Sequence, residues 1–176
     1  MSTSTKSIEL VTSQVKRIEK AKKGETILLM FPIMRDDIEE LVIYVKEKLI
    51  ISELSPIQKG DKDVFVREEF CLVPYSGDIL YKSDKHQNTE LIQWENSSEM
   101  TKEQSRFSLE CIDVRIVKVQ DIVQGSEIQK VNPNLLNYKM FIYWYNTQLK
   151  EQNINRTYED NDYIFLIEIK DEKDEL

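Results

Sequence analysis

The sequence predicts a mixed α+β domain, and three observations carry that prediction. Segments 63–70, 106–120 and 162–170 alternate apolar and polar residues with the period of two that is typical of strands. Segments 7–23 and 133–150 instead repeat apolar residues at helical spacing. The 176 residues include only 4 Gly and 4 Pro, a composition that favours one domain over flexibly linked modules.

The N-terminal segment 7–23 is the first expected helix. Its apolar face consists of Ile8, Val11, Val15 and Ile18, and Gly24 follows as a helix stop. Residues 1–23 hold six basic and two acidic side chains, a local charge of +4. We therefore predict an amphipathic extension over 1–24, whose basic face is either solvated or available to phosphate.

A short strand and a second helix are expected next. Residues 26–31 are apolar and end at Pro32, which fits a buried strand. Asp36 or Asp37 can cap the helix that follows. The apolar stripe of this helix consists of Ile38, Leu41, Val42 and Val45.

The middle of the chain is expected to hold a strand, a hairpin and a long loop. Alternation over 63–70 places Arg67 on the face of Phe65, opposite Val64, Val66 and Glu68. Residues 71–75 and 78–82 can form a hairpin that turns at Gly77. Polar residues fill 83–104, where we expect a functional or mobile loop anchored by Trp94.

Segment 106–120 gives the strongest strand signal. Its apolar residues change face part-way along, from Leu109 and Cys111 to Val114 and Ile116, so we predict a bend near Asp113.

Two further helices, a strand and a tail complete the expected elements. We predict a short helical turn over 121–130, and Pro133 should begin a helix that runs to about Lys150. The residues expected on the inward face of this helix are Leu135, Leu136, Ile142, Tyr145 and Leu149. Strand 162–170 closes the domain and precedes an acidic tail, 171–176.

The composition argues against several classes of protein. A net charge of −8 opposes strong, sequence-independent binding to a polyanion. No apolar run approaches the roughly 20 residues that span a bilayer. The N-terminus lacks the apolar core of a secretory signal, so we expect a cytoplasmic protein that does not engage a membrane. Cys71 and Cys111 are isolated and His86 is the single histidine, so we expect neither a metal site nor a cofactor.

Arg67 and Arg106 are the sharpest candidate site residues. Each lies at one end of an expected strand, where its planar guanidinium can bind a phosphate, a base edge or a carboxylate. The alternative is an internal ion pair, for example between Arg67 and Glu68, Glu110 or Asp113. Aromatic residues of the last helix can likewise form either a base-stacking platform or core; these are Tyr138, Phe141, Tyr143, Trp144 and Tyr145.

Three sequence blocks appear in an order that resembles the ASCH family. They are Lys59-Gly60-Asp61 with Phe65-Val66-Arg67-Glu68-Glu69-Phe70, then Ser105-Arg106-Phe107-Ser108-Leu109 with Val119-Gln120-Asp121-Ile122, and last Asn161-Asp162-Tyr163-Ile164. The resemblance covers Ile27 to Lys170. It implies a PUA-like mixed β-barrel flanked by helices over residues 25–170, of the type seen in many phage and bacterial proteins.

The chain departs from the family where the enzymes of the family carry catalytic residues. Their Lys-Thr turn after the first helix corresponds here to 44–50, which contains Lys46 and Lys48 but no Thr. Their catalytic Glu corresponds to the neighbourhood of Lys130. An enzyme needs its acid, base and nucleophile placed together, so these differences favour a protein without amidohydrolase activity.

The resemblance therefore implies a non-catalytic module that binds RNA or a nucleotide-containing ligand between barrel and helices. The candidate ligand-binding residues are Arg67, Glu68, Arg106, Asn161, Lys46 and Lys48. Two alternatives stay open: a hydrolase that acts on an acylated nucleoside, and a phage or mobile-element factor that binds a protein partner through the N-terminal helix.

Overall fold

A computed structural model describes residues 6–22, 24–86, 89–122 and 125–172. The described chain is a mixed α+β fold built on one five-stranded sheet with strand order β1-β3-β6-β7-β2. The strands of this sheet are β1 (Ser7–Glu9), β2 (Thr26–Pro32), β3 (Val64–Arg67), β6 (Ser108–Lys118) and β7 (Tyr163–Asp171). A separate hairpin pairs β4 (Phe70–Leu72) with β5 (Ile79–Tyr81).

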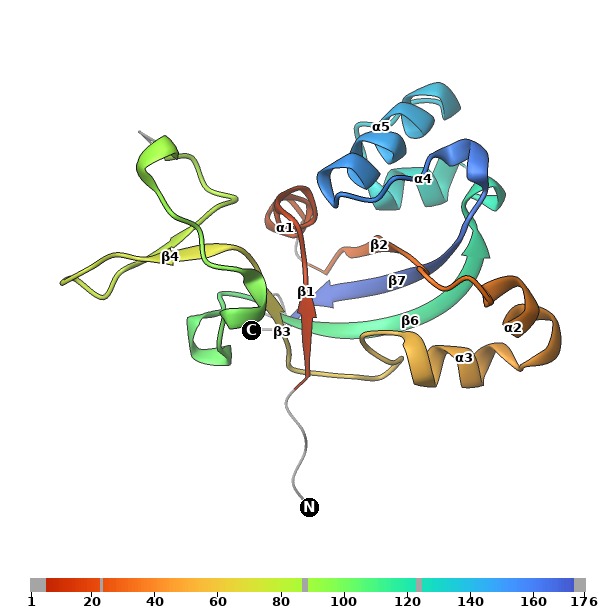
Figure 1. Cartoon of the computed structure of the whole chain (residues 1–176), viewed down its shortest axis with the longest axis horizontal. Coiled ribbons are helices and arrows are strands. Elements are labelled where there is room, and N and C mark those ends of the chain that lie inside the picture. Colours follow the sequence, from red (N-terminus) through yellow and green to blue (C-terminus); the bar gives the residue numbers. More distant parts are fainter. Residues whose placement is uncertain (1–5, 23, 87–88, 123–124, 173–176) are drawn as a thin grey trace, which may run out of the picture.

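Helices cover both faces of the sheet because β2 and β7 are apolar on both sides. Five helices are described: α1 (Thr12–Glu19), α2 (Ile38–Tyr44), α3 (Glu47–Leu54), α4 (Gly125–Val131) and α5 (Tyr138–Glu151). Leu28 and Leu166 belong to the cluster of buried residues formed with α4 and α5, whereas Leu29 and Ile167 belong to the cluster that includes residues of α1 and α3. Figure 1 shows α4 and α5 on one side of the curved sheet and α3 on the other.

The strand prediction around Asp113 is confirmed. The pairing of β6 with β7 shifts register between Cys111 and Asp113, as a β-bulge does. The shift moves the buried residues from odd to even positions, since Leu109 and Cys111 are buried before it and Val114 after it. The predicted hairpin is also confirmed, because Cys71 pairs with Leu80.

The N-terminal segment differs from the prediction of one helix over 7–23. Its first residues form β1, which pairs in parallel with β3, and α1 begins only at Thr12. Ile8 and Leu10 are both buried, a spacing of two that a strand can satisfy. The segment is therefore part of the sheet rather than an added helix outside it.

The last helix also begins later than predicted, at Tyr138 instead of Pro133. The side chain of Asn137 accepts a hydrogen bond from the backbone N–H of Met140 at 2.9 Å and so caps the helix. Leu136, predicted to point inward, is 78% exposed because it precedes the cap and does not share the helical periodicity. The aromatic residues Phe141 and Tyr145 are buried core, as one of the two sequence interpretations required.

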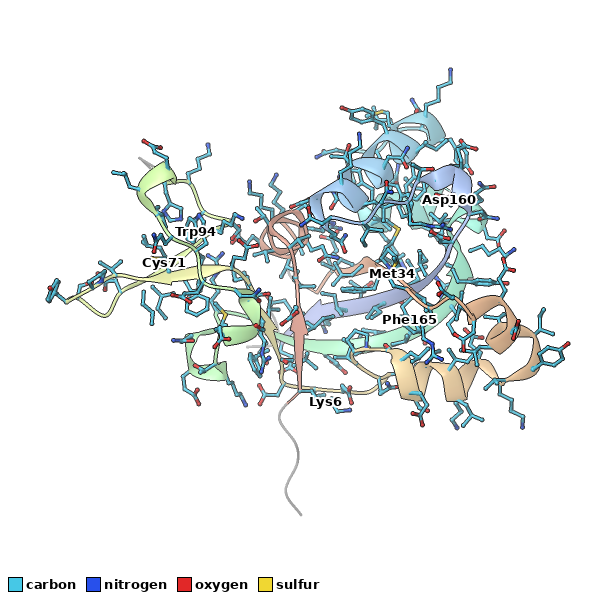
Figure 2. The ribbon with its side chains drawn as sticks, viewed as in Figure 1. Lys6, Met34, Cys71, Trp94, Asp160 and Phe165 are labelled. Carbon is cyan, nitrogen blue, oxygen red and sulfur yellow. The ribbon has the colours of Figure 1, made fainter. Side chains whose placement is uncertain are left out.

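The predicted barrel is not closed in the described part of the chain. The sheet has β1 at one edge and β2 at the other, and no described pairing joins them. The strand expected over 63–70 is also divided, because β3 ends at Arg67 and Phe70 starts β4 in the hairpin. The chain leaves the sheet at this point, and residues 70–86 and 89–104 form an arm whose hairpin projects from the sheet, with Cys71 and Trp94 well away from the helices (Figures 1 and 2).

The arm is more regular than the loop predicted for 83–104. It contains three short 3-10 turns, η1 (Thr89–Leu91), η2 (Ser97–Glu99) and η3 (Lys102–Gln104). The ring of Trp94 lies 5.4 Å from that of His86, a contact between two residues of this same segment. No helix in the described ranges has both the length and the apolar content needed to cross a bilayer.

Candidate nucleotide-binding corner

Arg67 and Arg106 lie beside each other where β3 ends and β6 begins. The two strands are antiparallel, with Phe65 opposite Ser108. Arg67 follows Phe65 by two residues and Arg106 precedes Ser108 by two, so both arginines lie just beyond this pair, at the same end of the two strands. The pairing of the strands thus brings together two residues that are 39 positions apart.

Arg106 is held by carboxylates from three different elements. Its Nε and Nη2 atoms donate to the two oxygens of Glu68 at 3.1 and 2.9 Å. Its Nη1 donates to Asp84 at 3.0 Å, and Nη2 lies 3.0 Å from Glu19 of α1. The guanidinium also lies 4.1 Å from the centroid of the Tyr81 ring. Arg106 therefore ties the sheet, α1 and the arm together.

Glu68 is the buried partner in this network. It is 2% exposed and accepts a hydrogen bond from Ser83 at 3.1 Å in addition to those from Arg106. Burial raises the pKa of Glu68 above its ordinary value, although the hydrogen bonds from Arg106 and Ser83 oppose that shift. The sequence left open an ion pair between Glu68 and Arg67; the structure instead pairs Glu68 with Arg106.

Arg67 has a very different environment. Among the arginines in the described ranges, the other five each pair with a carboxylate, whereas Arg67 has no carboxylate partner. Its Nη1 makes one long hydrogen bond, 3.4 Å, to the carbonyl oxygen of Ser98, and its buried Nε has no partner. The guanidinium lies 5.2 Å from the ring centroid of Phe65, within range of a cation–π contact.

A depression of about 280 Å³ lies over the start of β6; Arg67 does not line it but contacts Phe65, which does. The residues that line it are Asp63, Phe65, Lys102, Ser105, Arg106, Phe107 and Ser108. Lys102 donates to Asp63 at 2.6 Å, which lowers the pKa of that carboxyl group. We name Arg67 and these seven residues the sheet corner. It offers aromatic rings, a guanidinium and an ammonium group on one surface.

The remaining predicted residues lie elsewhere. Asn161 precedes β7, whose first residue pairs with the last residue of β6, so it lies at the opposite end of β6 from Arg106. It lines a separate depression of about 360 Å³ together with Arg35 and Arg156. Its side chain accepts a hydrogen bond from the backbone N–H of Gln120 at 3.0 Å and so holds a turn. The candidate residues therefore do not form one cleft.

Lys46 and Lys48 lie at the start of α3, and both are exposed. Lys48 lines a third groove, between α3 and β6, that contains none of the other predicted residues. Lys130, at the position that the family resemblance relates to a catalytic Glu, lies 3.7 Å from Glu168.

The sequence did not identify Lys102 and Phe107 as site residues, or Asp84 as a partner of Arg106. Lys102 and Asp84 lie in the segment expected to be an irregular loop, where no periodic pattern indicates which way a side chain points. Within the described ranges, no group of three or more His, Cys, Asp or Glu residues is arranged to hold a metal ion.

Comparison of the chain with protein-family models, with curated proteins and with solved structures finds no match in any of the three. The resemblance to the ASCH family therefore rests on the three sequence blocks alone.

Proposed function

We propose that this protein is a non-catalytic binding module of ASCH type that holds a nucleotide, or a nucleotide within single-stranded RNA, at the sheet corner. The observation that carries the proposal is that Arg67 lacks a carboxylate partner among the described residues. A PUA-like relationship belongs to the same proposal and is supported by the curved five-stranded sheet and the bulge in β6.

The chemistry of the corner suits a ligand that combines phosphate with a flat ring. A guanidinium has a planar fork of donors that matches phosphate oxygens, and Arg67 uses only one of these donors, in a long hydrogen bond. Lys102 is exposed at the rim, and its ammonium contacts a phosphate only when it leaves Asp63, with which it pairs at 2.6 Å. Phe107 is half-buried, so part of its ring can receive a base by stacking.

Arg106 has a positioning role in this proposal. Glu68, Asp84 and Glu19 already accept the hydrogen bonds of its guanidinium. The Arg106 side chain is therefore held in place and lines the corner, and it does not bind the phosphate. This assignment revises the expectation that both arginines contact the ligand directly. It also fits the net charge of −8, since a site built on Arg67 does not require a broad basic surface.

The test is binding of a fluorescently labelled single-stranded RNA, followed by anisotropy at several salt concentrations. Replacing Arg67 with Gln should weaken binding about tenfold to a hundredfold, since a hydrogen bond to a charged group contributes about 1.5–3 kcal/mol. The salt dependence of log K should fall by about 0.7 if one phosphate contact of a single strand is lost.

Arg35→Gln is the matched control, because it makes the same charge change at an exposed arginine beyond the other end of β6. It should leave affinity unchanged. Titration with adenosine and cytidine monophosphates, followed by NMR, separates a mononucleotide site from one that needs a polymer. Equal affinity of Arg67→Gln and the unmodified protein for every probe would refute the proposal, as would absence of binding at low salt.

A further inference from the structure

The bulge in β6 opens a groove on the face of the sheet that α3 covers. The loop before β3 is tied to β6 at the bulge, since the N–H of Gly60 donates to the carbonyl of Cys111 at 2.9 Å and Cys111 donates back to Asp61 at 2.8 Å. Beyond the bulge, β6 continues past α3, which lies on this side of the sheet (Figure 1). The space between the loop, α3 and the strand is a groove of about 480 Å³, which we name the α3–β6 groove.

The groove combines apolar contacts with a basic rim. Ile51 and Val114 supply apolar side chains, and Ser52 and Gln58 supply polar ones. The charged residues that line it are Glu47, Lys48, Lys59, Asp113 and Arg115, three basic and two acidic. The lining side chains sum to +1, and the sum is zero once Glu127, the partner of Arg115, is counted, so the positive charge of the groove is local to Lys48 and Lys59.

Glu47 and Asp113 form no ion pair with Lys48 or Lys59. Glu47 accepts a hydrogen bond from the backbone N–H of Ile116 at 2.9 Å, which fixes its carboxylate against β6. Arg115 pairs with Glu127 of α4 at 3.0 Å. Lys48 and Lys59 are exposed, and no carboxylate of the described residues lies within ion-pair distance of either.

We propose that the α3–β6 groove binds a small organic anion with an apolar body, such as an aromatic or short-chain carboxylate, sulfonate or phosphate ester. The apolar part lies against Ile51 and Val114, and the charged group lies between Lys48 and Lys59. The volume of the groove falls within the range of about 300–1,000 Å³ that is common for small-molecule sites. This site does not depend on the sheet corner, because the two share no lining residue.

The probe for the test is 8-anilinonaphthalene-1-sulfonate, compared with its uncharged counterpart N-phenyl-1-naphthylamine. The two differ only by the sulfonate, so their comparison isolates the contribution of the charge. We expect saturable binding of one sulfonate probe in the groove, measured by fluorescence titration. The double variant Lys48→Gln, Lys59→Gln should weaken binding of the sulfonate about fivefold while leaving the neutral probe unchanged, because each exposed charge contact is modest.

A second variant tests the place of binding without changing charge. Ser52 is exposed on α3, so Ser52→Trp should fill the groove, leave the fold intact and remove the saturable signal of both probes. The charge control is Lys16→Gln, Lys20→Gln on α1, which should leave affinity for the sulfonate unchanged. The proposal is overturned if Ser52→Trp binds the sulfonate as the unmodified protein does, or if the two lysine double variants have equal affinities.

Discussion

The ion pair of Arg106 with Glu68 gives the sharpest stability prediction. Replacing Arg106 with Met removes the guanidinium, and with it the contact with the Tyr81 ring, but keeps much of the apolar length of the side chain. Glu68 then stays in a site where its side chain is only 3% exposed, with Ser83 as its remaining hydrogen-bond donor. The carboxylate loses its countercharge without regaining water, and the folded state becomes less stable.

The magnitude follows from the burial of the two partners. Removing one member of a buried ion pair typically costs about 3–5 kcal/mol of unfolding free energy. Arg106 is 22% exposed and Ser83 still donates to Glu68, so we expect the lower end, about 3 kcal/mol. For a chain of this size, that corresponds to a fall in Tm of about 6–12 °C.

The assay is urea unfolding followed by circular dichroism, with Arg35→Met as the matched control. Arg35 pairs with Asp37, but both side chains are nearly half exposed, so the control should change stability by less than about 0.5 kcal/mol. The double variant Arg106→Met, Glu68→Leu should be more stable than Arg106→Met alone, because it leaves no unpaired buried carboxylate.

The loss of stability caused by Arg106→Met should also depend on pH, and the raised pKa of Glu68 determines whether the loss grows or shrinks as the pH rises. A carboxyl group whose pKa is higher in the folded state than in the unfolded state favours folding at low pH, and this contribution is lost as the pH rises through the folded pKa. Loss of Arg106 raises that pKa further. The destabilisation should therefore be larger at neutral pH than in mildly acidic buffer. A loss below about 1 kcal/mol at neutral pH, with no pH dependence, would refute the reasoning.

Three further predictions concern single side chains. Tyr145→Phe should leave stability unchanged or raise it by about 1 kcal/mol in thermal unfolding, since the buried hydroxyl has no partner among the described residues; a clear loss would contradict this. Cys111 should resist a thiol reagent at mildly alkaline pH while half-exposed Cys71 reacts, because burial raises the pKa of the Cys111 thiol to about 12. Mass spectrometry of the labelled protein measures this, and equal labelling of the two cysteines would contradict it. Asn161→Gly should cost about 1 kcal/mol in urea unfolding for the lost hydrogen bond with Gln120, and Asn161→Val should cost about 1–3 kcal/mol more, since Asn161 has a φ of 51°; equal effects of the two would refute this.

The periodicity of apolar residues predicted the strands in which buried and exposed side chains alternate regularly. The strand predicted over residues 162–170 is β7, and the bend predicted near Asp113 is a β-bulge. When the buried side chains of one strand move from odd to even positions, the strand must contain one extra residue, which is what a β-bulge inserts. The prediction of one helix over residues 7–23 was wrong for a related reason. Ile8 fits both a helix that includes Val15 and a strand that includes Leu10, and only pairing with β3 decides between them.

The candidate site was predicted in part. Arg67 and Arg106 were expected at strand ends, and antiparallel pairing of β3 with β6 places them side by side. Their different roles could not be predicted, because the partners of Arg106 come from distant segments. Glu19 belongs to α1 and Asp84 to the arm, and their approach depends on how these elements pack against the sheet. Asn161 was assigned to the same site, yet it lies beyond the opposite end of β6.

The sequence by itself determined that this protein is a mixed α+β fold, where most strands and helices lie, and that Arg67 and Arg106 fall at the ends of strands. These properties are local, since they depend on the periodicity with which apolar side chains can be buried. Tertiary structure alone decided which arginine is neutralised and which keeps unused donors. That difference depends on carboxylates contributed by α1, by Glu68 directly after β3, and by the arm. The distances between elements so far apart in the chain are set only when the elements pack together.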